Sequence, residues 1–170
     1  MLLTIAIPAH NKSDYLKQAI YSIKKELDFG KDVNIVISDN SSNDEIKEIY
    51  SQKFKDDENI NLFNSKEFPC LDSNVNRAVE LSTGKYVWIF GDDDLIVPGI
   101  LKKIKEFLYK EKPSLVVLNS MSFRNQEIIE ESRLPKCIKP IYGKKENDKF
   151  LIDLIGYLTY VGGILVEREL

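Results

Sequence analysis

Residues 86–94, Tyr-Val-Trp-Ile-Phe-Gly-Asp-Asp-Asp, are the most informative stretch of this chain. The apolar and aromatic run predicts a buried strand, and three carboxylates follow at its end. Three like charges there are costly unless a positive charge compensates them, and a hard divalent cation with oxygen ligands, Mg²⁺ or Mn²⁺, meets that need. The alternative interpretation is a solvated acidic turn that begins a helix, because Asp is also a good N-cap.

The bulk composition is that of one ordinary folded domain. A chain of 170 residues is long enough to bury a substantial core. Its composition, 43% hydrophobic and 30% charged, is ordinary for a folded domain. The net charge of −3 indicates no nucleic-acid partner. Cys70 and Cys137 form no C-x-x-C pair, so we expect neither a disulfide framework nor a zinc site, and a cytoplasmic location is the default. No signal peptide and no transmembrane segment is expected, because no apolar run approaches ~18–20 residues.

Strands and helices alternate about five times along the chain. Apolar runs predict strands at residues 3–7, 33–38, 60–63, 85–90 and 115–118. Amphipathic segments between them predict helices, with starts expected at Ser13, at a Ser42–Glu45 capping box, at Asp72 or Ser73, and near Pro98. The alternation predicts an α/β fold, a Rossmann-like, mostly parallel sheet with helices on both faces.

The last third of the chain is less regular. Residues 121–145 contain Pro135, Pro140 and Gly143 and predict a loop or excursion. A helix is expected over residues 148–158 and a last strand over residues 160–166.

Polar clusters follow three of the predicted strands. Residues 8–11 are Pro-Ala-His-Asn, residues 39–42 are Asp-Asn-Ser-Ser, and residues 92–94 are the three aspartates. Ligands of open α/β sheets bind at the carboxyl ends of the strands. The three clusters therefore predict one binding site at that edge of the sheet.

Each cluster also has a plainer interpretation. Asp39 can accept hydrogen bonds from a base or ribose, but Asp-Asn-Ser-Ser is typical turn composition. His10 can stack on a nucleobase, although a lone histidine is more often structural. Asn74, Asn76 and Arg77 can reach the site from a helix or simply face water. A P-loop and a G-x-G-x-x-G motif are absent from the sequence, and no Ser/His/Asp or Cys/His grouping is evident.

The order and spacing of these motifs over about residues 3–120 resemble the family 2 glycosyltransferases of the GT-A fold. The matching segments are residues 7–11, 37–44, 76–87, and 92–94 with Pro98. The resemblance implies a hexosyltransferase-like, inverting enzyme that uses a nucleotide-diphospho-sugar donor and Mg²⁺ or Mn²⁺. It also implies a glycan or lipid-linked acceptor, a role in bacterial surface polysaccharide or glycoconjugate synthesis, and peripheral membrane association of the full-length protein.

The resemblance also implies roles for individual residues. The nucleotide-sugar-binding residues would be Pro8, His10, Asn11, Asp39, Asn76, Asp92, Asp93 and Asp94. His10 replaces the family's usual Tyr beside the base, and Asp39 matches the acidic residue that binds base or ribose. The three aspartates match the D-x-D region that holds metal, diphosphate and sugar. Gly91 stands where the first Asp usually is, so metal ligation is assigned to Asp93 with Asp92 as a substitute, and Val75 stands where Arg is often found.

The family's general base, usually an Asp, lies in an acceptor-binding half, and we expect it beyond residue 170. Residues 1–170 are thus interpreted as one donor-binding domain, truncated before the acceptor half. Asp72, Glu127 and Asp153 are the first candidates within the chain. One alternative is a catalytically incomplete nucleotide-sugar-binding module. A sugar nucleotidyltransferase is less favoured, because residues 8–11 lack that class's Gly-rich, Arg- and Lys-containing loop.

Overall fold

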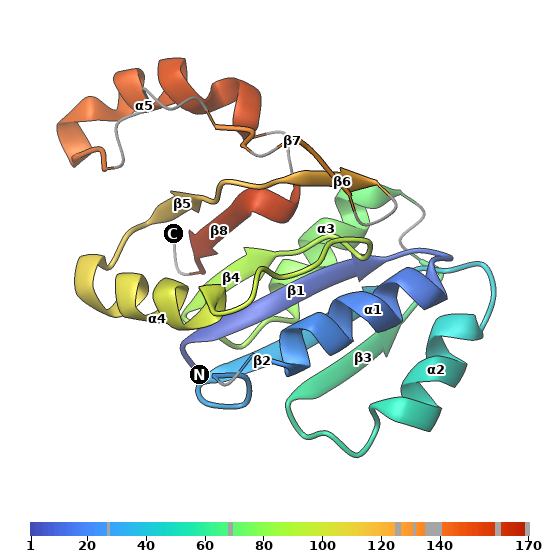
Figure 1. Ribbon diagram of the computed structural model, residues 1–170. Coiled ribbons are helices and arrows are strands. Elements are labelled where there is room, and N and C mark those ends of the chain that lie inside the picture. The colour runs from blue at the N-terminus through green and yellow to red at the C-terminus, as the bar shows by residue number, and fades with distance from the viewer. Residues whose placement is uncertain are drawn as a thin grey trace.

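A six-stranded sheet forms the centre of the molecule, in the order β3-β2-β1-β4-β8-β5 (Figure 1). The computed structural model describes residues 1–26, 28–67, 70–124, 127–130, 132–134, 141–158 and 161–168. Four adjacent strands pair in parallel, namely β1 (Leu3–Ala9), β2 (Val33–Asp39), β3 (Ile60–Asn64) and β4 (Tyr86–Ile89). The prediction of a mostly parallel α/β sheet is confirmed.

Helices cover both faces of this sheet. In Figure 1, α1 (Ser13–Lys24) and α2 (Glu45–Lys53) lie in front of the sheet and α3 (Leu71–Glu80) lies behind it. The side chains of β1 alternate between the faces, as the pleat requires. Ile5 and Ile7 enter the main core with α1, α2 and α4 (Ile100–Glu111), whereas Ala6 packs with Ala78 of α3. Burial on both faces explains why β1 and β2 are mostly apolar, with the buried Thr4 and Asn34 hydrogen-bonded to each other.

Two predicted helix starts are wrong in detail. The capping box at residues 42–45 does not form: α2 begins at Glu45 without a side-chain cap. The backbone N–H and the hydroxyl of Ser42 both donate to Asn11 Oδ1 instead, so a tertiary contact competes for the capping group. Pro98 precedes Gly99, the N-cap of α4, and therefore lies outside the first helical turn. The α1 and α3 starts are within two residues of prediction.

The last third contains more structure than the sequence predicted. Strands β6 (Ser122–Arg124) and β7 (Glu127–Glu130) form an antiparallel hairpin within the expected loop. Further on are η1 (Lys144–Glu146), α5 (Asn147–Leu154), η2 (Ile155–Tyr157) and η3 (Val161–Gly163). Pro135, Cys137, Pro140 and Tyr160 lie outside the described residues.

The final strand of the sheet runs in the opposite direction to its neighbours. Strand β8 (Ile164–Glu167) inserts between β4 and β5 (Leu115–Val117) and is antiparallel to both. Trp88 Nε1 donates to the Gly162 carbonyl at 2.9 Å, which holds η3 against β4. Over the described ranges, no helix is long and apolar enough to cross a membrane.

Candidate functional site

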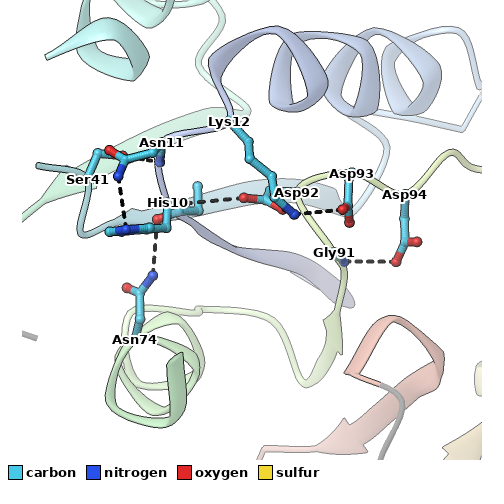
Figure 2. Close-up of polar contacts among 10 residues, drawn as sticks. His10, Asn11, Lys12, Ser41, Asn74, Gly91, Asp92, Asp93 and Asp94 are labelled. Carbon is cyan, nitrogen blue, oxygen red and sulfur yellow. Dashed lines mark hydrogen bonds and ion pairs between the residues drawn. The ribbon is translucent and has the colours of Figure 1, made fainter. Parts of the chain in front are cut away.

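The three polar clusters meet at one edge of the sheet, as predicted. Strands β1, β2 and β4 are parallel neighbours, and the register places Ala9 opposite Asp39. The loops after these strands are joined by hydrogen bonds. The His10 N–H donates to Asp92 Oδ2 at 3.2 Å, and the Asn11 N–H donates to the Ser41 hydroxyl at 2.8 Å. Figure 2 shows the resulting cluster of side chains.

The acidic triplet divides into a pair and a single residue. Lys12 Nζ lies 2.7 Å from Asp93 Oδ2 and 3.4 Å from Asp92 Oδ1, so the two carboxylates share one ammonium group (Figure 2). Asp94 instead accepts a hydrogen bond from the Gly91 N–H at 3.2 Å and closes its own turn. Asp92 and Asp93 therefore face a common position, and Asp94 faces another.

The environment of the pair alters two pKa values. Burial raises the pKa of Asp92, although the His10 N–H and the nearby Lys12 charge oppose this shift. The pKa of Lys12 is raised, first by its hydrogen bond to Asp93 and further by the charges of both aspartates, against the effect of burial. Lys12 is consequently charged at neutral pH, and a positive charge sits between the two carboxylates.

These residues fit a divalent cation. Carboxylate oxygens are the ligands that Mg²⁺ and Mn²⁺ prefer, and the Lys12 ammonium shows that a cation is accommodated between Asp92 and Asp93. Among the residues the structure describes, no three acidic, histidine or cysteine side chains converge on one position. A metal here would thus need further oxygens from water or a ligand, as phosphate-bound Mg²⁺ commonly does.

Asp39 is fully buried at the end of β2. Its Oδ1 accepts from the Ser41 N–H at 2.8 Å, and its Oδ2 accepts from the Asn64 side chain at 2.8 Å. Both carboxylate oxygens therefore stabilise the turn after β2 and the end of β3. These bonds support the turn interpretation, while the predicted contact with a base or ribose stays a prediction.

His10 and Asn11 form the exposed rim of the site. The His10 ring is accessible to solvent, and its Nδ1 lies 3.0 Å from Asn40 Oδ1. Asn11 Nδ2 lies 3.0 Å from the other ring nitrogen. Asn11 has a positive φ of 54°, a conformation that Asn tolerates better than most residues. Pro8 is buried inside β1 opposite Ser38, where it contributes to the strand rather than to the rim.

Helix α3 brings Asn74, not Asn76, into this cluster. Asn74 is 1% exposed, and its Nδ2 donates to the Ala9 carbonyl at 3.3 Å and to Asn40 Oδ1 at 3.2 Å. Its Oδ1 accepts from the Ser38 hydroxyl at 2.7 Å. Asn76 is exposed and leaves the helix about 200° further round its axis. The position of Asn74 in the first turn of α3, next to the carboxyl edge, is the signal that could have distinguished them.

Lys12 is the site residue that sequence reasoning missed. It precedes the first helical residue, Ser13, in the loop between β1 and α1. The available signal was a basic residue directly after the Pro-Ala-His-Asn segment, on the same edge as three carboxylates. A cation there is favourable because it offsets their repulsion.

None of the three candidate general bases, Asp72, Glu127 and Asp153, has the surroundings expected of a catalytic base. Asp72 is exposed in the first turn of α3, and Glu127 is exposed on β7. Asp153 accepts a hydrogen bond from the Tyr142 hydroxyl at 2.7 Å, and this bond lowers the pKa of Asp153. A lowered pKa makes a carboxylate a weaker base, so Asp153 is a poor candidate.

Comparison with known proteins identifies the class. The family model for glycosyl transferase family 2 matches residues 4–161. The chain belongs to this family, and the predicted family is confirmed.

Two curated relatives illustrate the similarity. The abequosyltransferase RfbV of Salmonella typhimurium is 32% identical over 110 residues, which are 64% of this chain and 33% of the relative. The GalNAc(5)-diNAcBac-PP-undecaprenol beta-1,3-glucosyltransferase of Campylobacter jejuni is 33% identical over 107 residues, covering 61% of this chain and 33% of the relative. The matched segment thus spans about a third of the length of each.

Solved structures confirm the GT-A fold. Residues 1–349 of S. aureus TarS in complex with UDP-GlcNAc superpose with a TM-score of 0.75 at 17% identity, covering 99% of this chain and 46% of that one. The mannosyltransferase PcManGT of Pyrobaculum calidifontis, in complex with GDP-Man and Mn²⁺, gives a TM-score of 0.66 at 14% identity and covers 98% of this chain and 44% of that one.

Proposed function

We propose that this chain is the donor-binding part of an inverting, hexosyltransferase-like glycosyltransferase of the cytoplasm. Its donor is a nucleotide-diphospho-sugar, and its acceptor is the hydroxyl of a glycan or lipid-linked molecule. The observation that carries the proposal is the Asp92–Asp93 pair around one positive charge at the carboxyl edge of the sheet. Family membership supports it, as does the binding of UDP-GlcNAc and of GDP-Man with Mn²⁺ by similar folds.

The names of the relatives support a role in polysaccharide or glycoconjugate assembly. They include an abequosyltransferase, a glucosyltransferase with an undecaprenol-linked substrate, and a putative glycosyltransferase of teichuronic acid biosynthesis, TuaG of Bacillus subtilis. A lipid-linked acceptor would place the full-length protein at the membrane surface, which is why we propose a peripheral association.

Different residues of the site would bind different parts of the donor. Asp93, with Asp92, would hold Mg²⁺ or Mn²⁺, which when bound neutralises the charge of the diphosphate leaving group. The exposed His10 ring would stack on the nucleobase. Asn74 and the Asp92 bond to the His10 N–H hold the loop after β1 in position. Orientation of this kind contributes to catalysis because the reacting atoms are then close before the reaction begins.

The proposal is tested first by nucleotide binding. A thermal-shift panel of UDP, GDP, CDP and dTDP with Mn²⁺ identifies the base, because a ligand that binds the folded state raises the melting temperature. Asp93→Asn is expected to weaken Mn²⁺-dependent binding of the selected nucleotide about tenfold or more, the effect of one lost charge-assisted contact of ~1.5–3 kcal/mol. Isothermal titration calorimetry measures the change.

Asp14→Asn is the matched control. Asp14 is an exposed aspartate of α1 whose partner is Lys17, at 2.9 Å, and its replacement should leave nucleotide affinity unchanged. Equal nucleotide affinity in the wild type and in Asp93→Asn, or with and without EDTA, would refute the metal role.

A further inference from the structure

The Lys12 ammonium lies between the two carboxylates that would hold a metal ion. Its ammonium contacts one oxygen of each carboxylate of the Asp92–Asp93 pair. A metal ion that used these oxygens would repel the ammonium at such short range. The pair can therefore hold Lys12 or a divalent cation between these two oxygens, but not both in this arrangement.

The loop that carries Lys12 allows its ammonium to move away from the two carboxylates while it stays close to the site. The His10 N–H is hydrogen-bonded to Asp92, so the backbone two residues before Lys12 is tied to the acidic pair. The Lys12 side chain is 47% exposed, and its flexible four-carbon stem can rotate in solvent. A displaced ammonium would thus stay within reach of any anion bound beside the pair.

The net charge of the site shows why the Lys12 ammonium and a divalent cation together would favour diphosphate binding. Two carboxylates and one ammonium leave a net negative charge, which repels a diphosphate. A divalent cation added to this set makes it net positive, so it attracts a diphosphate. Without Lys12 the same cation would only neutralise the pair. Lys12 therefore weakens metal binding but strengthens diphosphate binding.

We propose that Lys12 is the resident counter-ion of the Asp92–Asp93 pair, which a divalent cation displaces and which then binds the diphosphate of the donor. This inference rests on the proposed donor-binding function. It assigns a donor-binding role to a residue outside the acidic motif and predicts effects of opposite sign on the two ligands.

The test compares Lys12→Met with the wild-type chain. Mn²⁺ alone is titrated first, with the free ion followed by electron paramagnetic resonance, and UDP or GDP is then titrated by calorimetry at saturating Mn²⁺. Lys12→Met should bind Mn²⁺ about two- to fivefold more tightly, because one part-exposed ion pair no longer competes. It should bind the nucleotide about tenfold more weakly, because one charge-assisted hydrogen bond is lost.

Two further variants make the test specific. Lys12→Arg keeps the charge and should stay near wild type for both ligands, which also separates a folding defect from a charge effect. Lys17→Met removes a lysine of similar exposure that is paired with Asp14 on α1, and it should change neither affinity.

Each other outcome overturns the proposal in a recognisable way. If Lys12→Met binds both ligands more weakly, Lys12 only supports the local structure. If the wild type binds Mn²⁺ and nucleotide but Lys12→Met is unchanged, the counter-ion role fails while the proposed function stands. If neither chain binds Mn²⁺, the proposed metal role fails together with this inference.

Discussion

At the scale of single residues, the site is held by buried polar groups that complete one another's hydrogen bonds. Asp39 is the clearest example, because both its oxygens bond to groups of its own protein. Leaving a buried donor unsatisfied costs about 1–3 kcal/mol. Asp39 is therefore expected to contribute to stability whether or not it also contacts a nucleotide.

Two substitutions of Asp39 separate these contributions. Asp39→Ala should lower the free energy of unfolding by about 1–3 kcal/mol, since the Ser41 N–H and the Asn64 amide lose their acceptor. Asp39→Asn should be less destabilising, because its carbonyl oxygen still accepts one bond. Urea denaturation measures both changes.

The same variants test the nucleoside role by calorimetry. Both should weaken nucleotide binding while leaving Mn²⁺ affinity nearly unchanged, because Asp39 follows a different strand from the acidic pair. A folded Asp39→Asn variant with wild-type nucleotide affinity would leave Asp39 as a turn residue only.

At the scale of elements, the connection between α3 and β4 lies directly against β1 and is linked through β1 to β2 by hydrogen bonds. The Gly84 N–H donates to Thr4 Oγ1 at 2.8 Å, and Thr4 in turn donates to Asn34 Oδ1 of β2 at 2.7 Å. A Cβ added at Gly84 would lie 2.5 Å from the Thr4 backbone nitrogen and 2.8 Å from the Leu3 carbonyl carbon. Only glycine fits here, because the neighbouring atoms belong to the central strand.

Gly84→Ala should therefore destabilise the fold by at least about 2 kcal/mol, since backbone atoms of β1 must move to admit the methyl group. Chemical denaturation measures the loss. Gly156→Ala is the control: an added Cβ there meets no atom within 4 Å, so stability should change by no more than about 0.5 kcal/mol. Equal stability of the two variants would contradict this account of the Gly84 contact.

At the scale of the whole molecule, the geometry supports the proposed donor binding more strongly than it supports catalysis of sugar transfer. Asp92, Asp93, Lys12 and His10 are joined by ion pairs and a hydrogen bond, and we propose them as the anion and metal site. The candidate bases lie on other elements, and Asp153 is engaged by Tyr142. The matched segment also spans about a third of the two relatives compared above.

The 170-residue chain is accordingly expected to bind donor but to transfer little or no sugar. A positioned base contributes about 10²–10⁴-fold in rate, and transfer also requires an acceptor held beside the donor. Slow hydrolysis of the donor is the most we expect. A transfer assay should compare this chain with a full-length family 2 glycosyltransferase, such as the relatives compared above. Comparable turnover would contradict the prediction, and Asp72, Glu127 and Asp153 would then be mutated in turn.

The sequence by itself determined the first five strands, the class of fold and the edge of the sheet at which the three polar clusters meet. Residues 3–7 and 33–38 are apolar runs whose burial on both faces is a local property of composition. Parallel strands place their carboxyl ends together, so the meeting of residues 8–11, 39–42 and 92–94 followed from strand order alone.

Only the tertiary structure decided which side chains meet within that site. The choice of Asn74 over Asn76 depends on how α3 is rotated against β1 and β2. The loss of the Ser42 cap depends on Asn11, which is distant in sequence. Lys12 became a site residue only when the loop after β1 was placed against the loop after β4. Such contacts join residues far apart in the chain, so no local pattern of apolar and polar residues specifies them.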